Sequence, residues 1–221
     1  MTENPPECPL EPSTELFRLY PRYAPKPAPD GTPGCPAWFC GDIDHRFDLP
    51  GVGPGTCHVA ETLLGAFIEV YIRIWGKGID VDEVHSERRM AQLSAARQDG
   101  QAPLFVDLNS EANHGKRGVD ARLIDELEPP YPIPKGVDPY PRSRAFAQTV
   151  YEERLAGIKY ISTRDPGRKR VNYAFFGRAS GENRGILDVA SEGAVPLWVM
   201  YEASNRFRIP LKPSSAQYPL T

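Results

Sequence analysis

The sequence predicts an α+β fold, and three observations lead to this prediction. Segments with the apolar and β-branched composition of strands outnumber the helical segments. The two kinds of segment do not alternate regularly, as they would in a chain of β–α–β units. The 221 residues are 40% hydrophobic, which is enough for one large core. We therefore expect a single domain over residues 15–221, preceded by a disordered proline-rich lead over residues 1–14.

Short strands and long loops are predicted for the first part of the chain. The expected strands cover residues 16–20, 37–40 and 57–60. Six prolines fall between residues 21 and 36, which predicts a long irregular loop there. The third strand runs directly into a helix within Thr62–Trp75, whose residues are mostly apolar.

Further helices and strands are predicted for the rest of the chain. Helices are expected at residues 82–97, 119–127 and 142–155, and strands at 103–108, 157–162 and 171–176. A basic turn over residues 164–170 separates the last two strands. Residues 186–189 and 206–209 are expected to add edge strands.

Glu69 lies in the most apolar of the predicted helices. From Leu63 to Ile72 the other residues are apolar, aromatic or Gly, which is typical of a buried helix. An ionised carboxylate in such a helix is costly unless it is paired and hydrogen-bonded. Either Arg73, one turn further on, pairs with Glu69 at a partly exposed edge, or Glu69 opens into a functional site. This segment alone leaves both interpretations open.

Charge and hydropathy exclude several classes of protein. The net charge of −3 gives no electrostatic footprint for nucleic acid or for an anionic membrane. No apolar run approaches the roughly 20 residues of a membrane span, and the N-terminal residues lack a secretion signal. We therefore expect a cytoplasmic protein.

The chain also lacks the motifs of resident metals and cofactors. The cysteines at positions 8, 35, 40 and 57 do not have the paired spacing of a zinc site, and we expect free thiols. The Gly-rich stretch over residues 50–55 lacks the Lys-Ser/Thr ending of a phosphate loop. No metal and no resident cofactor are expected.

Four groups of residues together resemble the RES domain family, which is named for an Arg, a Glu and a Ser. They are Phe17-Arg-Leu-Tyr20, His45-Arg-Phe-Asp48, the segment from Cys57 to Glu69, and Gly157-Ile-Lys-Tyr-Ile-Ser-Thr-Arg164 followed by Asn172-Tyr-Ala-Phe-Phe-Gly177. No single motif is specific, but their joint order is. The resemblance covers residues 15–178, so residues 179–221 are treated as a C-terminal extension.

The resemblance implies a fold, an activity and a partner. The fold would be similar to that of ADP-ribosyltransferases: a split, strongly bent mixed β-sheet with surrounding helices and an NAD cleft. The activity would be that of a bacterial toxin that cleaves the nicotinamide–ribose bond of NAD, with water or phosphate as the acceptor. A helix-turn-helix antitoxin would neutralise the toxin, and the chain would assemble further, a homodimer being one form.

The resemblance also implies the site residues. The Arg would be Arg18 or Arg46, the Glu would be Glu69, and the Ser would be Ser162. Cleavage gives the ribose an oxocarbenium-like centre that a carboxylate stabilises. The pyrophosphate of NAD suits the forked donors of Arg, and Ser162 can hydrogen-bond the amide or a phosphate.

Two positions depart from the family's pattern. Leu19 and His58 stand where many members have Tyr, so two aromatic hydroxyls are missing from the substrate's surroundings. Tyr20 and Tyr160 are the candidates to replace them. His58 is either a ligand contact or a hydrogen-bonded core histidine, and Asn172 either contacts the ligand or holds a loop.

Two further functions remain alternatives to NAD cleavage with a small acceptor. An ADP-ribosyltransferase would use the same residues and transfer ADP-ribose to a macromolecule. A catalytically weak module that binds a nucleotide or a partner protein would account for Leu19 and His58.

Overall fold

The computed structural model describes residues 7–24, 31–40, 45–49, 54–71, 78–96, 100–124, 126, 138, 140–178, 181–182, 185–212 and 214. The strands within them are β1 Glu7–Pro9, β2 Leu16–Pro21, β3 Trp38–Phe39, β4 Pro54–Ala60, β5 Ile79–Asp80, β6 Arg88–Ala95, β7 Leu104–Asp107, β8 Gly157–Ile161, β9 Val171–Arg178, β10 Gly181–Glu182, β11 Leu187–Gly193 and β12 Leu211–Lys212. The helices are α1 Leu63–Tyr71, α2 Val81–Glu87, α3 Glu111–Lys116, α4 Ala121–Ile124, α5 Pro141–Glu152 and α6 Leu197–Phe207.

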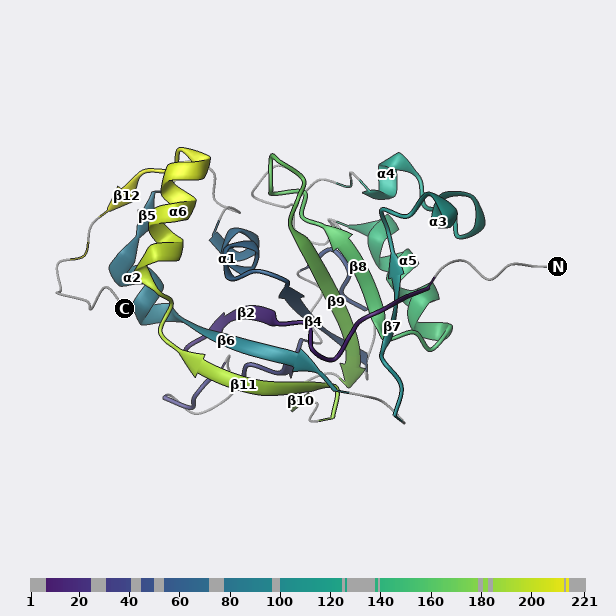
Figure 1. Ribbon diagram of the computed structural model, residues 1–221, viewed down its shortest axis with the longest axis horizontal. Helices are drawn as coiled ribbons and strands as arrows, with labels where there is room; N and C mark the ends of the chain where they lie inside the picture. Colours follow the sequence, from purple (N-terminus) through teal and green to yellow (C-terminus); the bar gives the residue numbers. More distant parts are fainter. Residues whose placement is uncertain are drawn as a thin grey trace.

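An eight-stranded mixed sheet organises the fold (Figure 1). Its strand order is β1-β7-β8-β9-β4-β2-β6-β11. β7 and β8 run parallel, and the other neighbouring strands of this sheet run antiparallel. β3 pairs with β10 and β5 pairs with β12 in two small additional sheets. The predicted α+β class with a mixed sheet is confirmed.

The large sheet is divided between β2 and β4. β4 pairs with β9 along its whole length, from Pro54 to Ala60, whereas β2 pairs with β4 only at Phe17 and Ala60. The chain enters α1 at Leu63, just after this single contact. Figure 1 shows the two halves of the sheet at an angle to each other, with α1 beside the opening. The split and bent sheet expected from the resemblance is therefore present.

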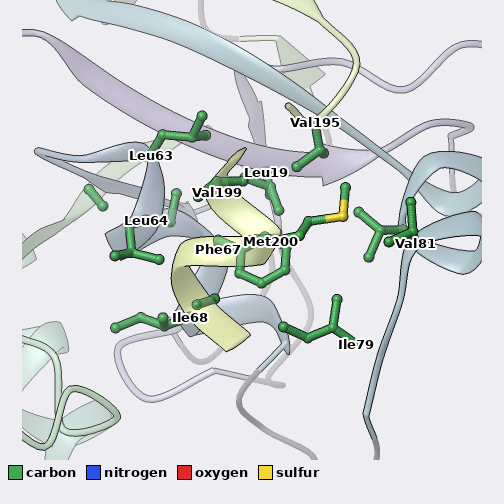
Figure 2. Close-up of a cluster of buried hydrophobic side chains, with 14 residues drawn as sticks. Leu19, Leu63, Leu64, Phe67, Ile68, Ile79, Val81, Val195, Val199 and Met200 are labelled. Atoms are coloured by element: carbon green, nitrogen blue, oxygen red, sulfur yellow. The ribbon is translucent and has the colours of Figure 1, made fainter. Parts of the chain in front are cut away.

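Helix α1 is apolar nearly all round because it is covered on several sides. It contacts β2, β4, β9 and α6, and its buried side chains meet those of α6 and β2 in one cluster (Figure 2). The buried side chains labelled there are Leu19, Leu63, Leu64, Phe67, Ile68, Ile79, Val81, Val195, Val199 and Met200. Each large side chain buried in this way contributes about 1.5–3 kcal/mol, so α1 is firmly held against the sheet.

The two faces of β2 contribute to different cores. Side chains alternate between the faces of a strand. Leu19 packs in the cluster around α1, while Leu16 and Tyr20 pack in a second cluster with Cys57 and Phe175 on the other face of the sheet. Side chains at even positions of β2 therefore face away from α1.

The helix predicted over residues 82–97 is wrong in its second half. Helix α2 ends at Glu87, and residues 88–95 form strand β6 between β2 and β11. The alternating Ala91, Leu93 and Ala95 are buried while the residues between them are less so. Pairing with two neighbouring strands therefore overrides the helical propensity of this charged segment.

Two smaller expectations are also corrected. Residues 206–209 do not form a strand, because Arg206 and Phe207 complete the last turn of α6. Residues 7–14 were expected in the disordered lead, but β1 pairs with the edge of β7 through Glu7, Cys8 and Pro9.

Gly157 occupies a place where neighbouring strands leave no room for a side chain. It pairs with Phe105 on one side and Phe175 on the other, and an added Cβ would lie 2.0 Å from the carbonyl oxygen of Ala174. We expect Gly157→Ala to lower the free energy of unfolding by about 1–3 kcal/mol, the range of an overpacked core. Urea denaturation measures the difference.

The matched control for this substitution is Gly193→Ala in β11. Nothing lies within 4 Å of a Cβ added at Gly193, so its free energy of unfolding should change little. Equal losses in the two variants would contradict the close approach at β8.

Candidate active site

Glu69 lies on α1, and its carboxylate contacts the hairpin formed by β8 and β9. Nδ2 of Asn172 donates a hydrogen bond of 2.8 Å to Oε1 of Glu69. Nη1 of Arg164 lies 3.6 Å from Oε2 and also donates to the backbone carbonyl of Glu69. The side chain of Glu69 is 25% exposed and that of Arg164 is 14% exposed. The carboxylate is therefore paired and hydrogen-bonded, yet one side remains open to solvent.

Among the described residues, the cation beside Glu69 is Arg164, in the turn between β8 and β9. Arg73, the alternative partner predicted from the sequence, lies outside the described residues. Ser162 is fully buried, and its Oγ accepts the backbone N–H of Arg164 at 3.1 Å. Asp165 closes the same turn by accepting backbone N–H groups of residues 167 and 169. Ser162 thus helps to fix the turn that carries Arg164.

Asn172 is oriented at a cost in free energy. It is 1% exposed, and within the described part of the chain its Oδ1 has no hydrogen-bond partner. An unpaired buried acceptor costs about 1–3 kcal/mol. Gly65 of α1 lies directly against this amide, because a Cβ there would be 3.6 Å from Oδ1 and 3.1 Å from the Cβ of Ala60. The close approach of α1 to β9 brings Glu69 within reach of Nδ2.

Tyr160 lies opposite Asn172 in the pairing of β8 with β9. It is 6% exposed, and its side chain lies on the same face of the sheet as that of Asn172, its direct partner across the two strands. Burial and the nearby charge of Glu69 raise the pKa of Tyr160, against the opposing effect of Arg164 and Arg46. The phenol therefore stays protonated at neutral pH and serves as a hydrogen-bonding group.

His58 joins Tyr160 to a buried carboxylate. Its Nδ1 lies 3.3 Å from the hydroxyl of Tyr160, and its Nε2 lies 3.3 Å from Oδ1 of Asp48. The other oxygen of Asp48 accepts the backbone N–H of His45 at 2.6 Å. Burial alone would raise the pKa of Asp48, but its hydrogen bond to His58 and the nearby imidazoles outweigh burial and lower that pKa below 3.8. Asp48 is therefore ionised at neutral pH.

Arg46 approaches the same region from the loop before β4. Its Nε donates to Oγ of Ser143 at 3.0 Å, and its Nη2 donates to the backbone carbonyls of Leu123 and Ile124. The guanidinium carbon lies 4.9 Å from the ring centre of Phe47. Burial lowers the pKa of Arg46, while Tyr160 and Glu69 are among the groups that oppose the shift. The cation is thus fixed on the side of the sheet that holds Glu69.

Arg18 and Tyr20 are not brought to this group of residues. Nη1 of Arg18 donates to the backbone carbonyls of Pro36 and Trp38, both at 2.7 Å, and lies 2.9 Å from Sγ of Cys57. The hydroxyl of Tyr20 donates to Glu192 on β11. Both side chains occupy the face of β2 that points away from α1, because they alternate with Leu19.

Four of the seven residues expected at the site therefore surround one region: Glu69, Asn172, His58 and Arg46. Ser162 supports this region indirectly, through its hydrogen bond with the backbone of Arg164. Arg164 and Asp48 were not among the residues predicted for the site. Arg164 follows Ser162 by two residues, and Asp48 follows Arg46 by two, so the nearby charged residues of each motif were the available signal.

The described residues contain no group of three or more His, Cys, Asp or Glu side chains with the geometry of a metal site. The four cysteines are free thiols. Among the helices in the described ranges, none has both the length and the apolar character needed to cross a membrane.

The contact between Asp48 and His58 makes stability depend on pH in a defined direction. A carboxyl whose pKa is lower in the folded state stabilises the fold above its ordinary pKa, and this stabilisation is lost as the pH falls. Asp48→Asn should therefore cost about 1–3 kcal/mol at pH 7, and the difference from the unmodified chain should shrink near pH 3. Urea unfolding at both pH values measures it. A difference that stays constant would contradict the ionised Asp48.

Comparison with known proteins identifies the fold and the family. No curated protein matches the chain in sequence. The crystal structure of the M. tuberculosis MbcT–MbcA toxin–antitoxin complex contains a similar chain, with a TM-score of 0.53 and 10% sequence identity over 89% of this chain and 90% of that chain. The model of the RES domain matches residues 21–197, which include Arg46, Glu69 and Ser162 but neither Arg18 nor Tyr20. The chain therefore belongs to the RES domain family.

Proposed function

We propose that this chain is an enzyme that cleaves the bond between nicotinamide and ribose in NAD, with water or phosphate as the acceptor. The observation that carries the proposal is the partly exposed carboxylate of Glu69, held by Asn172 and Arg164 on the same side of the sheet as Arg46. A carboxylate fixed in this way, with one side open, suits a substrate that develops positive charge.

Glu69 would act on the ribose attached to nicotinamide. As the bond to nicotinamide breaks, the ribose ring takes on oxocarbenium character, and a neighbouring carboxylate lowers the energy of that state or holds a ribose hydroxyl. Arg164 places a positive charge beside Glu69, and Asn172 fixes the orientation of the carboxylate. Nicotinamide leaves as a neutral molecule, so the reaction needs no acid on the leaving group.

Arg46 would bind the pyrophosphate of NAD. Its Nε and Nη2 are engaged by Ser143 and by the carbonyls of α4, which fixes the plane of the guanidinium. Within the described residues its Nη1 has no hydrogen-bond acceptor and is thus available to a phosphate oxygen. Arg suits this role because its donors form a rigid fork. Arg18 would instead support the loop around Trp38 through its carbonyl contacts.

The test of this activity is the release of nicotinamide from NAD by the purified chain. Glu69→Gln preserves the shape of the side chain and removes its charge, so we expect the rate to fall about 100-fold or more without loss of the fold. Glu202→Gln is the control, since Glu202 pairs with Arg206 on the surface of α6 and its loss should leave the rate unchanged. Intact NAD with the folded chain, or full activity in Glu69→Gln, would contradict the proposal.

The product of the same reaction shows which acceptor is used. Free ADP-ribose indicates water, and its 1″-phosphate indicates phosphate. Label from NAD that appears on protein or nucleic acid in a lysate would instead indicate an ADP-ribosyltransferase, which needs the same carboxylate beside the ribose.

We also propose that the chain is a toxin with a protein antitoxin. Support comes from its membership of the RES domain family and from the likeness of its fold to a chain in a toxin–antitoxin complex. The expected partner is a helix-turn-helix protein encoded beside this chain. Co-expression should give a purified complex in which NAD is cleaved more slowly than by the chain alone. Separate elution of the two proteins with unchanged NAD cleavage would contradict this partner.

A further inference from the structure

A series of neighbouring polar side chains connects a buried carboxylate to Glu69. Hydrogen-bond distances join Asp48 to His58 of β4 and His58 to Tyr160 of β8. Tyr160 pairs directly with Asn172 of β9, which donates to Glu69 on α1. We propose that Asp48, His58 and Tyr160 position Glu69 for catalysis, and that the protonation of His58 switches this positioning off. The inference rests on the proposed cleavage of NAD at Glu69.

The ionised Asp48 determines which nitrogen of His58 carries the proton. A carboxylate only accepts hydrogen bonds, so Nε2 of His58, 3.3 Å from Oδ1, must carry a hydrogen. In the neutral imidazole, Nδ1 is then an acceptor. The hydroxyl of Tyr160, 3.3 Å from Nδ1, donates its hydrogen to this nitrogen.

The direction of this hydrogen bond determines what Asn172 can do. With its hydrogen turned towards His58, the oxygen of Tyr160 is left to accept one N–H of the amide of Asn172, its direct partner across β8 and β9. The second N–H of Nδ2 is free to donate to Glu69, as the 2.8 Å contact shows. Oδ1 of Asn172, which has no partner within the described ranges, marks the cost of this arrangement, because the amide cannot turn over without losing Glu69.

Protonation of His58 exchanges the donor and acceptor roles along this series of side chains. Nδ1 then donates to the oxygen of Tyr160, and the phenol hydrogen must turn towards Asn172. Two hydrogens would then meet between Tyr160 and Nδ2, so the amide rotates and releases Glu69. No proton is transferred to the substrate in this scheme. His58 is therefore a positioning residue, not a catalytic one.

The charged and titratable groups around this imidazole come from several elements. In the loop before β4, His45 has its ring centre 5.2 Å from that of His58, and Asp48 lies at Nε2. Tyr160 of β8 lies at Nδ1. Beyond Tyr160 are Glu69 of α1 and the cations Arg46 and Arg164. The surroundings of His58 thus include the acidic side chains Asp48 and Glu69 and the basic side chains His45, Arg46 and Arg164.

The first experiment measures kcat for NAD cleavage as a function of pH. For the unmodified chain, kcat should fall as the pH is lowered from about 8 to 5, the range in which imidazole changes charge. We call this fall the acid limb of the profile. His58→Gln cannot titrate and should lose this acid limb, with kcat at pH 8 lowered about 10- to 100-fold and KM changed by less than about threefold. His114→Gln, on an exposed position of α3, is the control and should keep the limb.

Tyr160→Phe distinguishes positioning from direct contact with the substrate. If His58 acts through Tyr160, removal of the hydroxyl should abolish the acid limb although the imidazole is still present. A limb that persists in Tyr160→Phe, or one that persists in His58→Gln, would overturn the proposal.

The second experiment does not depend on NAD cleavage. ¹⁵N NMR of the histidine side chains at pH 8 should show His58 as the Nε2-protonated tautomer, and Asp48→Asn should remove this preference. The Nδ1-protonated tautomer in the unmodified chain would overturn the proposed switch even in an active enzyme. Conversely, a correct tautomer with no release of nicotinamide at any pH would count against the proposed function alone.

Discussion

The single residue pair that joins β2 to β4 is the constraint on which the rest of the structure depends. Because Phe17 and Ala60 are the only paired residues, the sheet opens beyond them, and α1 starts at Leu63 beside the opening. α1 is buried against β2 and α6 on one side and meets β9 on the other. The helix therefore carries Glu69 to the start of β9 in the other half of the sheet, where it contacts Asn172 and Arg164.

The energetics around Glu69 favour a site over a purely structural ion pair. A buried ion pair seldom adds much stability, because desolvation offsets the attraction between the charges. Here one side of the carboxylate stays open, and Oδ1 of Asn172 has no hydrogen-bond partner among the described residues while Nδ2 orients Glu69. Features that cost stability without an evident structural return are expected where a protein holds a functional group in place.

The sequence was sufficient to predict the fold class, most strands and the unusual position of Glu69. The partners of Glu69 were harder to predict, because Arg164 follows it by 95 residues and reaches it only through the packing of a turn. The order of the motifs alone could not place Arg18. Which face of the sheet its side chain occupies depends on how β2 pairs with β6. Residues 88–95 were misread for a similar reason: their charges suggested a helix, but pairing on both sides makes them a strand.

The central claim is that the ribose next to nicotinamide lies against Glu69. A crystal structure of Glu69→Gln with intact NAD bound tests this claim most directly, because the substitution keeps the shape of the side chain and slows cleavage. We expect the nicotinamide ribose within hydrogen-bond distance of residue 69 and the pyrophosphate in contact with Nη1 of Arg46. A dinucleotide bound on the opposite face of the sheet, near Arg18 and Tyr20, would contradict it.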